Sequence, residues 1–314
     1  MSCLALDIRN LEKNYGGPKV VDDLTLSIEP GEIFGLLGPN GAGKSTTINM
    51  VAGVTRIGGG TISIFGYDNR RDYRTARRLT GVMHQEIVID NFFSIERALK
   101  IHAGYFGVVD DPAWRNLLID RLGLRPHLGK VMFKLSGGLK RRFMIAKALV
   151  HKPRLLILDE PTAGVDVELR HTLWEFVREI NTQGTTILLT THYLEEAEQM
   201  CDRIAIMHHG KLVALEKTAD LTARHGQRHL ELTLKEALTV VPDTLAQFSP
   251  RLSNDGLALE LTLATDSVVG EILDRVRAAG IEVVDVDTRQ PHLEDIFLQL
   301  TGIGAGNGGE NHGA

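Results

Sequence analysis

The segment at residues 38–46 constrains the fold of this chain more than any other. Its sequence, GPNGAGKST, fits the pattern G-x-x-x-x-G-K-[ST] through Gly38, Gly43, Lys44 and Ser45. A short apolar run, EIFGLL, precedes it, and STTINMVAG at its end is typical of a helix. In such a loop the backbone N–H groups close around phosphate oxygens, the lysine adds a positive charge and the hydroxyl can bind Mg²⁺. The sequence therefore predicts a strand, a phosphate-binding loop and a helix that begins at about Gly43 and points its N-terminus at the phosphates.

A second segment, RLLILDEPTAGVD, joins a buried-strand pattern to two acidic residues. The apolar run at residues 155–158 is followed by Asp159 and Glu160, at the edge of a parallel sheet where ligands bind. By itself the pair would indicate a solvated loop before a helix. With a phosphate-binding loop in the same chain, Asp159 is expected to hold Mg²⁺ and Glu160 to polarise an attacking water.

A third segment, LSGG at residues 135–138, opens the amphipathic stretch LKRRFMIAKALV. Ser-Gly-Gly alone is a common loop tripeptide. With the two segments above, in this order, the chain closely resembles the ATP-binding subunits of ABC transporters. The resemblance covers residues 4–217 and implies ATP hydrolysis, with ATP and Mg²⁺ as the bound groups.

Further residues match the motifs of that family one by one. Tyr15 matches the aromatic residue on which adenine stacks, and Gln85 matches the Q-loop glutamine that approaches Mg²⁺. Asp166 matches the D-loop aspartate, and His192 matches the switch histidine that contacts the γ-phosphate. The resemblance thus implies four catalytic residues, Lys44, Gln85, Glu160 and His192. It implies that Mg²⁺ is held by Ser45, Gln85 and Asp159. The implied nucleotide-binding residues are Tyr15, Gly38, Pro39, Asn40, Gly41, Ala42, Gly43, Lys44, Ser45, Thr46, Ser136, Gly137, Gly138 and Asp166.

The signature segment departs from the commonest family pattern, LSGGQ, because Leu139 stands in the fifth position. The hydroxyl of Ser136 and the backbone amides of Gly137 and Gly138 carry the chemistry, and these are retained. An apolar residue followed by Lys-Arg-Arg, together with the ending PHLEDIFLQLTG, resembles the ABC-2 type exporters.

Charge and hydropathy narrow the class of partner. The net charge of −5 speaks against a general nucleic-acid role, and no stretch approaches the roughly 18 consecutive apolar residues of a membrane helix. The resemblance implies a head-to-tail homodimer and a separate ABC-2 type permease, which would hold the chain at the cytoplasmic face of the inner membrane. Phe92, Phe93 and Ile95 are candidates for the permease contact or for the core. Two alternatives stay open: an importer ATPase, and a soluble ABC ATPase that acts on ribosomes or DNA.

The composition changes after residue 221. Residues 1–221 are expected to form the ABC ATP-binding domain, an α/β P-loop NTPase core with a mixed, mainly parallel sheet, an antiparallel β-subdomain and a helical subdomain at about 86–150. Within residues 222–301, apolar and polar residues alternate with period 2 in runs that flank helical segments near 268–278 and 292–300. This pattern predicts a small accessory α/β domain with an antiparallel sheet. Residues 302–314 include six glycines and are expected to be disordered.

Overall fold

The computed structural model describes residues 3–86, 92–165, 167–225, 228–263, 267–289 and 293–302. The chain folds as two compact units, Met1–Lys217 and Thr218–Ala314. Asp166 lies outside the described residues, and so does the Gly-rich tail beyond residue 302.

The first unit is built around a six-stranded sheet of order β10-β9-β3-β8-β7-β6. All its pairings are parallel except that of β9 with β10. β3, β7 and β8 are buried at every position, as expected for a parallel sheet covered on both faces. The strands are β3 (Ile33–Leu37), β6 (Thr80–Met83), β7 (Leu155–Asp159), β8 (Thr186–Thr190), β9 (Arg203–His208) and β10 (Lys211–Lys217).

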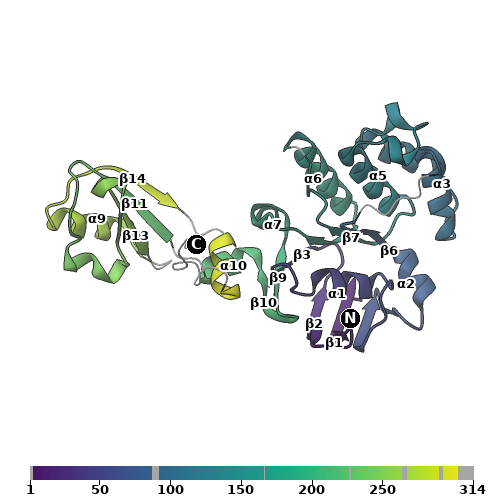
Figure 1. The fold of residues 1–314 in the computed structure, drawn as a ribbon, viewed down its shortest axis with the longest axis horizontal. Coiled ribbons are helices and arrows are strands. Elements are labelled where there is room, and N and C mark those ends of the chain that lie inside the picture. The colour runs from purple at the N-terminus through teal and green to yellow at the C-terminus, as the bar shows by residue number, and fades with distance from the viewer. Residues whose placement is uncertain are drawn as a thin grey trace, which may run out of the picture. The chain divides into compact units, whose positions relative to one another are not determined.

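A second, antiparallel sheet of order β2-β1-β4-β5 belongs to the same unit. Helix α1 (Lys44–Val51) lies between the two sheets (Figure 1), and its Ile48 and Met50 share one apolar core with strands of both. The predicted mixed sheet and antiparallel β-subdomain are therefore confirmed. The strands are β1 (Leu6–Asn14), β2 (Lys19–Ile28), β4 (Gly59–Ile64) and β5 (Tyr67–Asp68).

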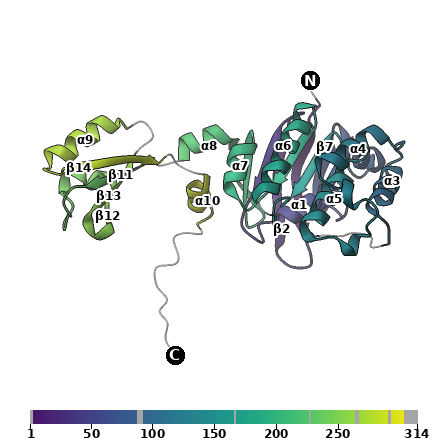
Figure 2. The same ribbon diagram turned by 90° about the horizontal axis from the view of Figure 1, so that it is seen from above.

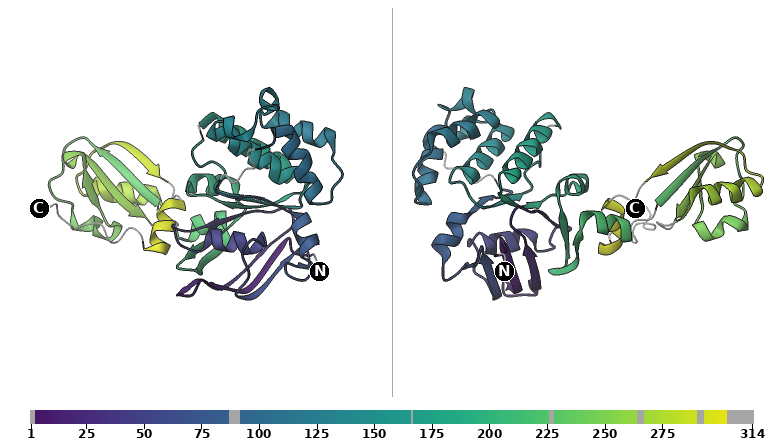
Figure 3. Two further views of the ribbon diagram at one scale, coloured as in Figure 1. Left: turned by 45° about the vertical axis from the view of Figure 1, so that its right-hand side comes forward. Right: turned by 180° about the vertical axis from the view of Figure 1, so that it is seen from behind.

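Helices cover the other face of the parallel sheet, where Figures 1 and 3 both show the teal helices opposite the purple strands. α3 and α4 each pack on α5, and the three make up the predicted helical region. Among the described residues, no helix combines the length and the apolar character that a membrane span requires. The helices are α2 (Tyr73–Leu79), α3 (Ile95–Tyr105), α4 (Pro112–Arg121), α5 (Gly137–Leu149), α6 (Val167–Thr182) and α7 (Leu194–Met200).

The second unit has its own antiparallel sheet, of order β12-β13-β11-β14. Helix α9 (Val269–Ala278) lies along this sheet (Figure 2), and Ile272 and Val276 of the helix pack on leucines of β11 and β13. Helices α8 (Thr218–His225) and α10 (Leu293–Thr301) contact each other. The predicted small α/β unit is confirmed. Its strands are β11 (Arg228–Leu234), β12 (Arg251–Ser253), β13 (Ala258–Leu263) and β14 (Val283–Arg289).

Candidate nucleotide-binding site

The loop between β3 and α1 has a backbone that only glycine fits at two positions. Gly38 has φ 156°, and a Cβ there would lie 2.4 Å from the carbonyl oxygen of Met207. Gly43, the N-cap of α1, has φ 101°, and a Cβ there would lie 2.6 Å from the carbonyl oxygen of Val20. Both glycines thus let the loop pack closely on β9 and β2. The predicted strand, loop and helix are confirmed, with α1 beginning at Lys44.

A cavity of about 370 Å³ opens on this loop. It is large enough for a small-molecule ligand, and it joins the loop to Gln85 and Glu160 from distant parts of the sequence. A Cβ at Gly41 would have no atom within 4 Å, so the loop backbone is accessible there. The lining residues are Val20, Asn40, Gly41, Ala42, Gly43, Lys44, Ser45, Thr46, Gln85 and Glu160.

The ammonium group of Lys44 lies under the loop. The residue is 9 % exposed, and its Nζ donates to the carbonyl oxygens of Gly38 at 2.6 Å and Pro39 at 3.1 Å. Burial lowers the pKa of Lys44, and the negative charges of Glu160 and Asp159 oppose that shift. Because both hydrogen-bond partners are neutral, an anionic phosphate would be a stronger acceptor for this cation.

Asp159 ends β7 as a buried carboxylate. It is 4 % exposed, and Oγ1 of Thr190 donates to its Oδ1 over 2.5 Å. Ser45 lines the phosphate-loop cavity and carries a hydroxyl oxygen. Mg²⁺ prefers oxygen ligands and is commonly held by one or two protein oxygens together with the phosphates. The donor set of Asp159 and Ser45 fits that ion.

Glu160 is held in an uncommon backbone conformation, with φ 49°. Its N–H donates to both the carbonyl oxygen and the Oγ1 of Thr190, each at 3.1 Å. Gln85 Nε2 donates to Glu160 Oε2 over 2.9 Å, and His192 Nδ1 lies 3.4 Å from the same oxygen. The structure thus places Gln85 and His192 against the carboxylate of Glu160, whose side chain is 12 % exposed. Lys44, the fourth residue expected to be catalytic, lines the same cavity as Gln85 and Glu160.

The signature segment lies elsewhere. Ser136 is the N-cap of α5 and accepts from Leu139 N at 3.4 Å. Ser136 and Gly137 are exposed, and a Cβ at Gly137 would have no atom within 4 Å. Among the described residues, those lining the phosphate-loop cavity do not include Ser136, Gly137 or Gly138. Packing within the described part of the chain therefore does not require a glycine at position 137.

Tyr15 follows the end of β1 and presents its ring to solvent. The residue is 63 % exposed, and Lys13 Nζ lies 4.8 Å from the ring centroid. An exposed aromatic ring of this kind can stack on a planar base. The structure therefore leaves Tyr15 available for the expected role, whereas Asp166 lies outside the described residues.

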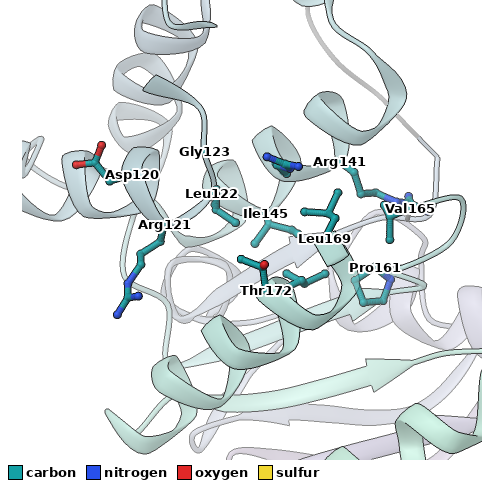
Figure 4. A pocket seen from close by; sticks show the side chains of 12 residues that line it. Asp120, Arg121, Leu122, Gly123, Arg141, Ile145, Pro161, Val165, Leu169 and Thr172 are labelled. Atoms are coloured by element: carbon teal, nitrogen blue, oxygen red, sulfur yellow. The ribbon is translucent and has the colours of Figure 1, made fainter. Parts of the chain in front are cut away.

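Arg141 is a residue that the sequence analysis missed. It is 6 % exposed, and its guanidinium donates to the carbonyl oxygens of Gln85 at 2.9 Å and Ala163 at 3.2 Å. Figure 4 shows Arg141 extending from α5 toward the loop of Pro161 and Val165, beside a cavity of about 360 Å³. Burial lowers the pKa of Arg141, and the charges of Glu160 and Asp159 oppose the shift. Only its place between Lys140 and the apolar run from Phe143 could have signalled a buried cation.

A buried carboxylate, Glu196 in α7, was also missed. It is 6 % exposed and accepts hydrogen bonds from the hydroxyls of Thr162 and Thr191. The sequence signal was slight, because a glutamate in the acidic run LEEAE is typical of a solvated helix.

The sequence of this chain matches two family models and many known proteins. The family model described as "ABC transporter" matches residues 21–163, and a model described as "AAA domain, putative AbiEii toxin, Type IV TA system" matches residues 131–196. The linearmycin resistance ATP-binding protein LnrL of Bacillus subtilis (strain 168) is 36 % identical over 95 % of this chain and 98 % of its own. The Nod factor export ATP-binding protein I of Burkholderia pseudomallei (strain 1710b) is also 36 % identical, over 96 % of this chain and 98 % of its own.

Solved structures show the same fold. An ATP-binding subunit of an ABC transporter matches with a TM-score of 0.65 and 32 % identity, over 69 % of this chain and 91 % of its own. A bacterial Atm1-family ABC exporter with ATP bound matches with a TM-score of 0.64 and 23 % identity, over 72 % of this chain and 41 % of its own. The chain belongs to the ATP-binding subunits of ABC transporters, ATPases that hydrolyse ATP for transport.

Proposed function

We propose that this chain is the motor subunit of an ABC-2 type exporter. It pairs head to tail with a second copy around two Mg-ATP and drives a separate permease. The observation that carries the proposal is that the phosphate-loop cavity and the exposed signature residues at the start of α5 lie apart in one chain. The phosphate loop opens on one cavity, and the N-terminus of α5 with Ser136 and Gly137 is exposed outside it.

The dimer follows from that separation. The N-terminus of a helix attracts anions through its free N–H groups and its dipole, and α5 is a 13-residue helix that begins with the exposed residues Ser136 and Gly137. In a head-to-tail pair, Ser136 of one copy would meet the γ-phosphate bound by Lys44 of the other. ATP would then hold the two copies together, and hydrolysis would release them.

The residues of the cavity divide the work of hydrolysis. The loop amides and Lys44 bind the β- and γ-phosphates and offset their charge. Glu160 polarises the attacking water, and Gln85 and His192, which contact Glu160, orient it toward the γ-phosphate. Asp159 and Ser45 would hold Mg²⁺, which when bound neutralises charge that develops on the phosphate oxygens.

A permease contact is proposed beside Gln85. Phe92 is 88 % exposed, whereas Ile95 is fully buried and belongs to the core. Phe93 is half-buried, with the guanidinium of Arg97 5.3 Å from its ring centroid. We therefore assign the docking role to Phe92. Through this contact the chain would lie at the cytoplasmic face of the inner membrane.

Two of the relatives are named for Nod factor export and for linearmycin resistance. These names favour a role in export over the alternatives of an importer ATPase and a soluble ATPase. The signature variant and the C-terminal ending support the ABC-2 branch. An importer ATPase would share the same catalytic residues. A soluble ATPase acting on ribosomes or DNA is disfavoured by the net charge of −5.

Two substitutions test the catalytic site. Glu160→Gln should keep ATP binding and lower turnover by at least ~10²-fold, because one preorganised catalytic group is lost. Lys44→Ala should instead weaken ATP binding itself. Phosphate release and binding of a fluorescent ATP analogue measure the two effects. Near-normal hydrolysis by the first variant, or full-strength binding by the second, would contradict these roles.

The permease is tested by affinity capture from detergent-solubilised membranes, with Glu160→Gln and Mg-ATP holding the dimer closed. We expect one multi-helix membrane protein bound to a pair of these chains, and loss of that protein on Phe92→Asp with ATPase activity retained. Recovery of ribosomal or DNA-processing proteins, without a membrane protein, would favour the soluble alternative.

A further inference from the structure

The turn after Glu160 is tied to the segment of His192 through one buried carboxylate. Thr162 is fully buried, and its Oγ1 donates to Oε2 of Glu196 over 2.9 Å. Thr191 is 2 % exposed, and its Oγ1 donates to the same oxygen over 2.9 Å. We propose that Glu196 is a positioning residue that holds Glu160 and His192 in one geometry, an inference that rests on the catalytic roles proposed above.

The first half of this link concerns the backbone of Glu160. A non-glycine residue with a positive φ is strained and keeps that conformation only where its surroundings enforce it. Glu160 has φ 49°, and the next turn is closed by a bond from Ala163 N to Glu160 O at 3.3 Å. The hydroxyl of Thr162 lies inside this turn and ties it to α7. The bond to Glu196 therefore fixes the direction in which the Glu160 side chain leaves the sheet.

The second half concerns His192. The hydroxyl of Thr191 donates to Glu196 and accepts from Tyr193 N at 3.0 Å, so it fixes the backbone on both sides of His192. The guanidinium of Arg170 lies 4.2 Å from the Tyr193 ring centroid, and its Nε lies 3.2 Å from Glu196 Oε1. The buried carboxylate thus has a cation beside it and holds both loops against α6.

The arrangement needs a carboxylate. One oxygen of Glu196 receives two hydroxyl protons while the other faces Arg170, and an ionised carboxylate has acceptor sites for all of these groups. A glutamine that turned its NH₂ toward the guanidinium would place donor against donor. One that turned its NH₂ toward the hydroxyls would take away the oxygen to which both donate. Removal of the carboxylate would also leave the Arg170 guanidinium without its ion-pair partner and two hydroxyls without their acceptor, which destabilises the fold. The sharper test removes one hydroxyl and leaves Glu196 in place.

Thr162→Val removes the hydroxyl and keeps the shape of the side chain. We expect kcat for ATP hydrolysis to fall about 10-fold with KM for ATP changed by less than about two-fold, because only the placement of Glu160 is affected. Thr162→Ser restores the donor and should restore kcat. Thr186→Val is the matched control: Thr186 is fully buried in β8 and accepts from Gly31 N at 2.9 Å. It should lower the unfolding temperature and leave kcat unchanged.

A double substitution tests whether the effect passes through Glu160. In a Glu160→Gln background, Thr162→Val should lower the residual rate no further, since the residue that it positions no longer acts. An unchanged kcat in Thr162→Val, an equal loss in Thr186→Val or a full further loss in the double variant would each overturn the role of Glu196. Near-normal hydrolysis by Glu160→Gln alone would instead overturn the catalytic assignment.

Discussion

Lys44 and Glu160 are each held in a conformation or environment that is costly by itself. Lys44 is a buried cation, and Glu160 has a left-handed backbone. Each cost is offset by neighbouring residues. The charges of Glu160 and Asp159 favour the protonated form of Lys44, and both the carbonyl oxygen and the hydroxyl of Thr190 accept a hydrogen bond from the N–H of Glu160. Residues held in this way cluster at functional sites. The cost and its compensation lie within the same few residues.

His102 of α3 and His151, two residues after α5, are expected to make stability depend on pH. His151 is 3 % exposed, and its ring centroid lies 3.8 Å from that of Phe106 in a stacked arrangement. Burial lowers the pKa of His151 to about 4 and that of His102 to about 3, from an ordinary value of 6.5. Between pH 6.5 and these values the unfolded chain binds more protons than the folded one, so the free energy of unfolding falls as pH is lowered.

For His151 alone the loss across this window is up to about 3 kcal/mol. His151→Gln should therefore reduce the slope of the free energy of unfolding against pH, measured by urea unfolding between pH 6.5 and about 4. The reduction should correspond to close to one bound proton. His171→Gln on α6, where the side chain is 76 % exposed, is the control and should keep the wild-type slope. An unchanged slope in His151→Gln would show that this imidazole does not gain its proton on unfolding.

At the scale of elements, α5 joins two parts of the site. Its N-terminus carries the exposed signature residues, and one turn later Arg141 binds the backbone of Gln85 and Ala163. A movement of α5 is therefore transmitted to the Q-loop and to the turn after Glu160. We therefore expect α5 to couple the signature residues at its N-terminus to the Q-loop.

Arg141→Lys tests this link. A lysine keeps the charge but cannot direct two donors at two fixed carbonyl oxygens as the guanidinium does. We expect ATPase activity to fall about 10-fold, with ATP affinity changed by less than about two-fold, because the phosphate loop is untouched. Arg178→Lys, which alters an exposed arginine bonded to the carbonyl oxygen of Gln199, should have little effect. Equal activity in both variants would contradict the link.

The elements with strong patterns were predictable from sequence. The amphipathic stretch that follows LSGG forms most of α5 at 137–149, and the period-2 runs near the C-terminal end are strands β11, β13 and β14. The three-residue strand β12 (Arg251–Ser253) was not predicted, because it is too short to show a period and forms only by pairing with β13. Spacing and resemblance proposed Gln85, Glu160 and His192. Arg141, Thr162 and Glu196 could not be found, because their roles depend on burial created by tertiary packing.

At the scale of the molecule, each unit has a separate apolar core. The first core joins both sheets to α1, and the second lies between the C-terminal sheet and α9. The motif residues of the site that the structure describes belong to the first unit. Ligand binding should therefore stabilise the first unit selectively.

Scanning calorimetry of the full chain measures this. We expect two unfolding transitions, and Mg-ATP should raise the midpoint temperature of only one of them. The reason is mass action: a ligand that binds only the folded state adds about 2.7 kcal/mol to the free energy of unfolding at a concentration of a hundred times Kd. Glu160→Gln is suited to the experiment because it should bind without turnover. A single transition that shifts as a whole would show that the two cores unfold together.

The contact between α8 and α10 has a consequence for protein engineering. α8 is the first helix of the second unit and α10 its last described helix, and the two are in contact. A module whose ends meet can be inserted, exchanged or removed at a single junction with little disturbance of its host. Residues 218–302 are thus a natural cassette for grafting between motors of this family.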